Sequence, residues 1–187
     1  MAPVRIVQPR VTYADLERAP EDGLRYELYD GEVFVVPAPV PRHQLVQVLV
    51  LDVLRGHAGR HGGLAIGSPI DIVFSQYDVL QPDVVFFSAA RRHLVDLDSV
   101  IRNAPDLCVE VLSASTEHRD RGRKMQIFAR YAVPEYWIVD PRAETIEVYQ
   151  RVGSSFALIA TVSGDEPFTS PTVEGLAFPP AQIFQIA

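Results

Sequence analysis

The sequence predicts a mixed α/β (α+β) fold, in which a central mixed β-sheet is flanked by helices and extended by β-hairpins. Two short apolar runs, residues 79–87 and 106–112, have the length and composition of buried strands, and the Pro82-Asp83 step interrupts the first of them. Residues 43–60 and 120–131 repeat apolar side chains every three to four positions, which predicts amphipathic helices. The two classes of segment follow one another along the chain, so both belong to one core.

The composition predicts a single globular domain over residues 1–187. Hydrophobic residues make up 48% and charged residues 22% of the chain, which excludes disordered and fibrous classes. No apolar run approaches the roughly 20 residues of a membrane span, and the N-terminus lacks a signal-peptide core, so we expect a cytoplasmic protein without a membrane partner. The one cysteine, Cys108, cannot form an internal disulfide, which fits a reducing compartment.

The first elements are predicted from local signals. Residues 1–11 are expected to be a loose N-terminal arm. Thr12 is a good N-cap for a short helix over residues 12–18. Residues 25–29 and 32–36 flank Asp30-Gly31, which is the strongest hairpin signal in the chain.

The middle of the chain supplies the main helix and then the strands. Residues 43–60 predict the helix that packs on the sheet, and Gly62 ends it. Residues 64–66, 69–74 and 79–87 are expected to be antiparallel strands.

The last third of the chain completes the sheet. After the buried strand 106–112 and the helix 120–131, residues 136–139 predict another strand. Residues 145–151 and 155–162 alternate well enough to form a closing hairpin. Residues 168–184, rich in proline and phenylalanine, predict an irregular cover.

Two acids stand inside the buried strand runs, and they are the main functional candidates. Asp83 follows Pro82 in the first run, and Glu110 is the single charge in the second. A buried ionised carboxylate costs several kcal/mol unless a metal ion or a cation pairs with it. Lys124, one position from the apolar stripe of the next helix, can lean over the ends of these strands.

Two acids and a lysine are the constellation that a metal-dependent phosphodiesterase needs. The acids would hold a hard cation, Mg²⁺ or Mn²⁺, through oxygen ligands. The cation lowers the pKa of water and neutralises phosphate charge, and Lys124 orients the water or offsets charge in the transition state.

Four further side chains have both a structural and a functional interpretation. Glu27 either faces solvent on the hairpin or belongs to the site. His43 either contacts a phosphate or is an ordinary histidine at a helix start, and Asp71 is either a third carboxylate around the metal or a polar residue near a turn. Asp120, four residues before Lys124, forms a helix ion pair of roughly 0.2–0.5 kcal/mol or also fixes the direction of the lysine.

Charge limits how this protein can bind nucleic acid. The net charge of −7 has the wrong sign for DNA binding over the whole surface, so binding would be local. Positive charge concentrates at Arg119, Arg121 and Arg123, which form either a solvated helix face or a nucleic-acid contact beside the acids.

Other chemistries have little support in the sequence. No phosphate-binding loop, dinucleotide fingerprint or nucleophile elbow occurs, and the histidines and the cysteine are too scattered for a zinc site. A glycosidase-type pair of carboxylates remains an open alternative.

The motifs occur in an order that resembles a known family. They are Tyr26-Glu-Leu-Tyr-Asp-Gly-Glu32, His43-Gln44, Pro82-Asp83, Glu110-Val-Leu-Ser113, Asp120 with Lys124, Tyr131, and Glu135-Tyr-Trp-Ile-Val-Asp-Pro141. Together, over about residues 12–185, the sequence resembles the Uma-type restriction-endonuclease-like family of the PD-(D/E)XK nuclease superfamily, long filed as a domain of unknown function. The resemblance implies a restriction-endonuclease-like core, with Asp83 and Glu110 as metal ligands and a role for the first acid, Glu27. The superfamily places a lysine two residues after the second acid. That position is Leu112 here, and Lys124 would replace the lysine.

The leading functional prediction is therefore a Mg²⁺-dependent endonuclease that hydrolyses nucleic acid, with DNA as the expected substrate. The alternative is a nuclease-fold protein that binds nucleic acid or a protein partner without cutting, which Leu112 and the acidic net charge favour. A homodimer is expected under either hypothesis, because double-strand cleavage needs two sites and exposed hairpins offer pairing edges.

Overall fold

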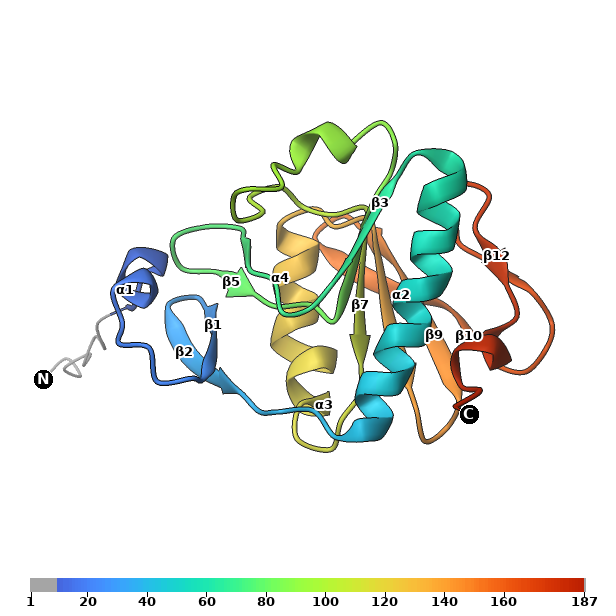
Figure 1. The fold of residues 1–187 in the computed structure, drawn as a ribbon, viewed down its shortest axis with the longest axis horizontal. Coiled ribbons are helices and arrows are strands. Elements are labelled where there is room, and N and C mark those ends of the chain that lie inside the picture. Colours follow the sequence, from blue (N-terminus) through green and yellow to red (C-terminus); the bar gives the residue numbers. More distant parts are fainter. Residues whose placement is uncertain (1–9, 187) are drawn as a thin grey trace, which may run out of the picture.

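The computed structural model describes residues 10–186 and centres on a six-stranded mixed sheet (Figure 1). The strands lie in the order β10-β9-β8-β7-β6-β3. Their bounds are β3 (Leu64–Gly67), β6 (Val84–Phe87), β7 (Leu107–Val111), β8 (Glu135–Asp140), β9 (Thr145–Val152) and β10 (Ser155–Val162). Strands β7 and β8 are parallel and the other neighbours are antiparallel, which confirms the predicted mixed sheet.

Helices cover both faces of this sheet. In Figure 1 the sheet stands between α2 (Pro41–His61) and α4 (Met125–Arg130). Val109 and Trp137 pack with the apolar side chains of α2, whereas Cys108 and Tyr136 pack with those of α4. Because both faces are buried, β7 and β8 carry apolar side chains at nearly every position. This is why residues 106–112 were recognisable as a buried strand.

A second, smaller sheet extends the molecule on the side of the N-terminus (Figure 1). Its strands, in order, are β2 (Glu32–Val36), β1 (Arg25–Tyr29), β5 (Val79–Leu80) and β4 (Ile72–Val73). The predicted turn is confirmed: Asp30 and Gly31 have φ angles of 53° and 83°, as a two-residue hairpin turn requires.

The N-terminal helix α1 (Tyr13–Glu17) begins with the predicted cap, a capping box between Thr12 and Asp15. Of the predicted loose arm, residues 1–9 lie outside the described residues. Val11 donates a hydrogen bond to the backbone oxygen of Gly31 at 2.9 Å, so the arm is attached to the hairpin at its end.

The predicted strand over residues 79–87, interrupted at Pro82-Asp83, proves to be two strands that belong to different sheets. The chain leaves the small sheet after β5, passes through residues 81–83 and enters the large sheet as β6. Pro82 has no N–H to donate to a ladder, and the N–H of Gln81 binds the Glu27 side chain at 2.8 Å instead. This change of sheet places Asp83 directly before β6.

The helix predicted over residues 43–60 is confirmed as α2, which is slightly longer. The helix predicted over residues 120–131 begins earlier and is not α-helical throughout. It starts as α3 (Glu117–Arg119), continues through a π-helical segment η2 (Asp120–Lys124) and ends as α4. The wider π turn changes the angular spacing of side chains, and such turns often occur at functional sites. Asp120 and Lys124 are both buried within it.

The C-terminal part confirms the β9–β10 hairpin and partly corrects the cover that follows it. Residues 168–184 contain a short strand pair, β11 (Phe168–Thr169) and β12 (Ala177–Phe178), and a 3₁₀ helix η3 (Pro180–Ile183). The rings of Phe168 and Phe178 pack on Trp137.

Another 3₁₀ helix, η1 (Arg92–Leu94), lies in the connection before β7. Within residues 10–186, no helix combines the length and apolarity that crossing a membrane requires.

Candidate active site

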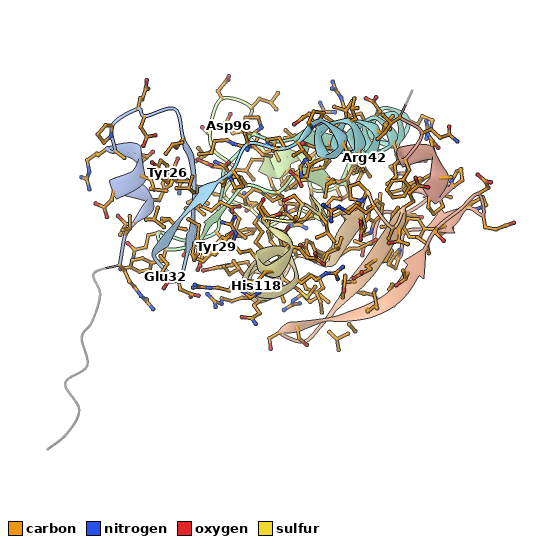
Figure 2. All side chains as sticks on the ribbon, turned by 90° about the horizontal axis from the view of Figure 1, so that it is seen from below. Tyr26, Tyr29, Glu32, Arg42, Asp96 and His118 are labelled. Atoms are coloured by element: carbon orange, nitrogen blue, oxygen red, sulfur yellow. The ribbon has the colours of Figure 1, made fainter. Side chains whose placement is uncertain are left out.

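The candidate site is a cleft of about 450 Å³ between the β1–β2 hairpin, the start of α2 and the loop after β7. Asp83, Glu110 and Lys124 all line it. Figure 2 views the end of the molecule at which α2 and α3 begin, marked by Arg42 and His118. The three residues predicted to act together are therefore brought together by the fold.

Asp83 and Glu110 come from neighbouring antiparallel segments. Val84, next to Asp83, pairs with Val109, next to Glu110. Asp83 Oδ2 accepts a hydrogen bond from the backbone N–H of Val111 at 2.7 Å. The same oxygen lies 3.2 Å from His43 Nε2. The acid is thus held by the strand that carries its partner and by the first turn of α2.

Helix α2 fixes this corner of the site with two side chains. Besides His43, Gln47 donates to the backbone oxygen of Asp83 at 3.0 Å and to Ser68 Oγ at 2.9 Å. Burial tends to lower the pKa of His43, but the hydrogen bond and the charge of Asp83 outweigh it and raise the pKa. A protonated His43 would offset part of the charge on Asp83.

Lys124 is the centre of a buried ionic network. Its Nζ lies 2.9 Å from Glu110 Oε1, 3.1 Å from Glu27 Oε1 and 3.6 Å from Asp120 Oδ1. None of these four side chains is more than 6% exposed. Glu27 is itself fixed by the N–H of Gln81 and by the hydroxyl of Tyr29. The hairpin, strand β7 and the π segment therefore meet at one ammonium group.

The network contains three acidic side chains, Glu27, Glu110 and Asp120, but only one basic side chain, Lys124. Burial raises the pKa of Glu110 well above its ordinary value; Lys124 opposes this, whereas the nearby Asp120, Asp83 and Glu27 add to it. Burial alone would lower the pKa of Lys124, but its acidic neighbours raise it well above the usual range. Lys124 is therefore protonated at neutral pH and acts as a cation rather than a base.

Asp83 and Glu110 each retain a carboxylate oxygen that would serve as a ligand to a divalent cation. Within residues 10–186, no three His, Cys, Asp or Glu side chains form a complete metal cage. Asp83 uses Oδ2 and Glu110 uses Oε1 in the hydrogen bonds described above, which leaves Oδ1 and Oε2 for a ligand role. Mg²⁺ is usually held by one or two carboxylates together with waters and substrate phosphates, so this donor set suits it.

Of the other predicted side chains, Glu27 and Asp120 belong to the site. Asp71 is connected to it only through Gln81. Glu27 does not simply face solvent, and Asp120 is buried with neither carboxylate oxygen in a hydrogen bond within the described residues. Asp71 accepts a hydrogen bond from Gln81 Nε2 at 2.7 Å, and Gln81 in turn connects it to Glu27.

The predicted nucleic-acid-binding arginines have structural partners. Arg121 binds both oxygens of Glu147, at 2.6 and 2.8 Å, and Arg123 binds Glu32 and the backbone oxygen of Tyr29. Arg119 donates to the backbone oxygen of Val35 at 3.3 Å. These contacts fasten the helix to the hairpin and to β9, and a role in binding nucleic acid stays a prediction.

Sequence reasoning missed Gln47, Gln81 and Tyr29, which position the acids. Their polar groups act through tertiary contacts that no local pattern reveals. One further signal was available for the lysine: among the 17 basic residues Lys124 is the only lysine. Its ammonium is a compact point charge with three donors, which can bind several carboxylates at once.

Comparison with known proteins identifies the family and the fold of the chain. The sequence matches the Uma2 family, described as "Putative restriction endonuclease", over residues 12–181. A search of curated proteins gave no match. A crystal structure described as a putative nuclease belonging to DUF820, from Anabaena variabilis, superposes with a TM-score of 0.76 at 18% identity, over 93% of this chain and 97% of that one. At this identity the likeness establishes the shared fold. With the family match covering most of its length, the chain belongs to the Uma2 family of restriction-endonuclease-like proteins.

Proposed function

We propose that the protein is a metal-dependent endonuclease that hydrolyses the phosphodiester bonds of nucleic acid, with DNA as its substrate. The family and the fold support the nuclease class. The observation that carries the proposal is the contact of 2.9 Å between Lys124 and Glu110 beside Asp83, in an accessible cleft. Two acids and a cation there match the needs of phosphodiester hydrolysis.

Asp83 and Glu110 would hold Mg²⁺ or Mn²⁺ through the oxygens that their hydrogen bonds leave over. Such a cation, when bound, neutralises phosphate charge and lowers the pKa of a water molecule. His43 and the N–H of Val111 keep the Asp83 carboxylate in place. The acids of the site therefore do not need to reorganise when substrate arrives.

Lys124 supplies positive charge to the reaction. Because it is protonated, it donates hydrogen bonds, and with substrate bound it would orient the attacking water or offset charge on a phosphate oxygen. Glu27 and Asp120 restrict the position of its Nζ from two sides. Both acids act as positioning residues in this scheme.

The surroundings of Leu112, where the superfamily has its lysine, support Lys124 on the helix as the replacement. Leu112 is 8% exposed and belongs to the apolar cluster that contains Ile127 and Phe128. A lysine there would have to bury its charge among apolar side chains. Lys124 reaches Glu110 from the π segment instead, which favours the cutting enzyme over the non-cutting alternative.

The test is a cleavage assay with matched variants. Purified protein is incubated with single-stranded and duplex DNA in Mg²⁺ or Mn²⁺, with EDTA as the blank. Asp83→Asn and Glu110→Gln are expected to lower the rate by about 10²–10³-fold or more, since each removes a charged oxygen ligand. Asp98→Asn, the same change at an exposed site, should have no effect. Cleavage that persists in EDTA or in both site variants would refute the proposal.

A further inference from the structure

The acids that line the cleft are largely buried. The side chains of Glu110, Lys124 and Asp83 are only 4%, 6% and 14% exposed. The cleft volume of about 450 Å³ falls in the range of about 300–1,000 Å³ that holds one group of drug size, such as a single nucleotide. A duplex is stiff over the length of such a site, whereas a flexible single strand can bend into the cleft, so the burial of these acids favours a single strand.

The walls of the cleft suit bases better than a second phosphate backbone. They are mainly apolar, formed by Leu24, Val36, Pro37, Ala38, Pro39, Val40 and Pro69. Leu24 and Val40 are 54% and 59% exposed, so they offer apolar surface to a ligand. Of the basic side chains that line the cleft, Arg25 donates to the backbone oxygen of Pro37 and Lys124 binds Glu110. A duplex would require a much more basic surface.

A second pocket of about 330 Å³ continues from the cleft, and it carries the missing positive charge. The two share Val40, His43, Ser113 and Ser115 as lining residues, so they adjoin. The second pocket also contains Arg42 and Arg142, which are exposed, and neither forms an ion pair within residues 10–186. Figure 2 places Arg42 at this end of the molecule.

The acids in the second pocket have hydrogen-bond partners other than these two guanidinium groups. Glu117 is paired with Arg121 at 2.9 Å. Asp140 accepts the backbone N–H groups of Arg142 and Ala143. The two guanidinium groups therefore remain available for a ligand anion, unlike the arginines that fasten the helix to the hairpin.

We infer that the site acts on single-stranded DNA: one nucleotide occupies the apolar cleft, the scissile phosphate lies at Asp83 and Glu110, and the adjacent phosphate binds Arg42 and Arg142. This inference rests on the proposed nuclease function and adds its substrate class. The phosphate contacts position the strand, and the apolar walls accept any base. Sequence preference would accordingly be weak.

The first experiment compares a 5′-labelled single-stranded oligonucleotide with the blunt duplex of the same sequence. Cleavage is measured as kcat/KM in Mg²⁺, and binding is measured by fluorescence anisotropy in EDTA. We expect at least about a tenfold preference for the single strand in both, because a nucleotide taken from a duplex must first be unpaired.

The outcomes separate the inference from the proposed function. Equal or better cleavage of the duplex overturns the inference and leaves the nuclease function intact. Preferential binding of the single strand without any cleavage supports the inference about the ligand and refutes the nuclease function. Absence of both binding and cleavage refutes both.

The second experiment tests the arginine pair. Arg42→Ala/Arg142→Ala should raise KM at least about tenfold with kcat nearly unchanged, and should lower the slope of log K against log salt by about 0.7 for each phosphate that the variant no longer binds. Arg55→Ala, an exposed arginine farther along α2, is the control and should change neither quantity. A double variant with the KM and salt slope of the wild type would overturn the assignment of this phosphate subsite.

Discussion

Replacing Lys124 with methionine tests the buried network directly, because methionine keeps the apolar stem and removes only the charge. The ammonium is the shared partner of Glu110, Glu27 and Asp120, none of which is more than 4% exposed. Removing one partner of a buried ion pair costs about 3–5 kcal/mol. Burial already raises the pKa of Glu110, so this acid can take up a proton and limit the loss. We therefore expect a decrease of about 3 kcal/mol in the free energy of unfolding.

The assay is urea denaturation followed by fluorescence of Trp137, the single tryptophan, which is fully buried in the native state. Arg55→Met is the control, because it removes a positive charge at an exposed position of α2 and should cost no more than about 0.5 kcal/mol. The double variant Glu110→Gln/Lys124→Met removes the ammonium together with the charge of Glu110, one of its three acidic partners, and should regain about 1–2 kcal/mol over Lys124→Met alone. A loss below about 1 kcal/mol for Lys124→Met, or full additivity in the double variant, would refute this description of the network.

Two predictions concern parts of the fold away from the acids. The hydrogen bond from Arg121 holds the pKa of Glu147 below its ordinary value, so the stabilisation it gives is present above the unfolded pKa and is lost as the pH falls through the folded pKa. Glu147→Gln should therefore reduce stability at pH 7 by about 0.5–1 kcal/mol, a figure discounted because Arg121 is partly exposed. The difference from the wild type should shrink as the pH falls through the lowered pKa of Glu147. Thermal unfolding across pH checks this, and a constant difference would contradict it. Gly63→Ala places a Cβ 2.8 Å from Phe86 and should cost about 1–3 kcal/mol, whereas Gly59→Ala meets no atom within 4 Å and should stabilise α2 by about 0.5–1 kcal/mol; the opposite order in urea denaturation would show that close packing does not govern these sites.

Much of the fold could be predicted because its signals are local. Burial on both faces makes β7 apolar throughout, and the Asp30-Gly31 turn is encoded in two adjacent residues. The change of sheet at residues 81–83 was not predicted, because a continuous apolar run does not reveal which partner strand each half joins. The π segment was missed for a related reason: its spacing differs from that of an α-helix by a single residue.

The candidate site was predicted in its composition but not in its full connections. Asp83, Glu110 and Lys124 could be selected because charges within apolar surroundings are unusual. The inclusion of Glu27 depends on the pairing of β1 with β5, which brings a hairpin residue to the lysine over a long sequence distance. Gln47 remained hidden for the same reason, since its hydrogen bonds are made to Ser68 and to the backbone of Asp83.

The central claim is that Asp83 and Glu110 bind a divalent cation beside Lys124. Because Lys124 is the only lysine, labelling with ¹³C-lysine gives one side-chain signal, and its chemical shift can be followed by NMR as Mg²⁺ is added. We predict a saturable shift in the wild type that is lost in Asp83→Asn and retained in Asp98→Asn. A Lys124 signal that stays unchanged at millimolar Mg²⁺, or that shifts equally in Asp83→Asn, would contradict the claim.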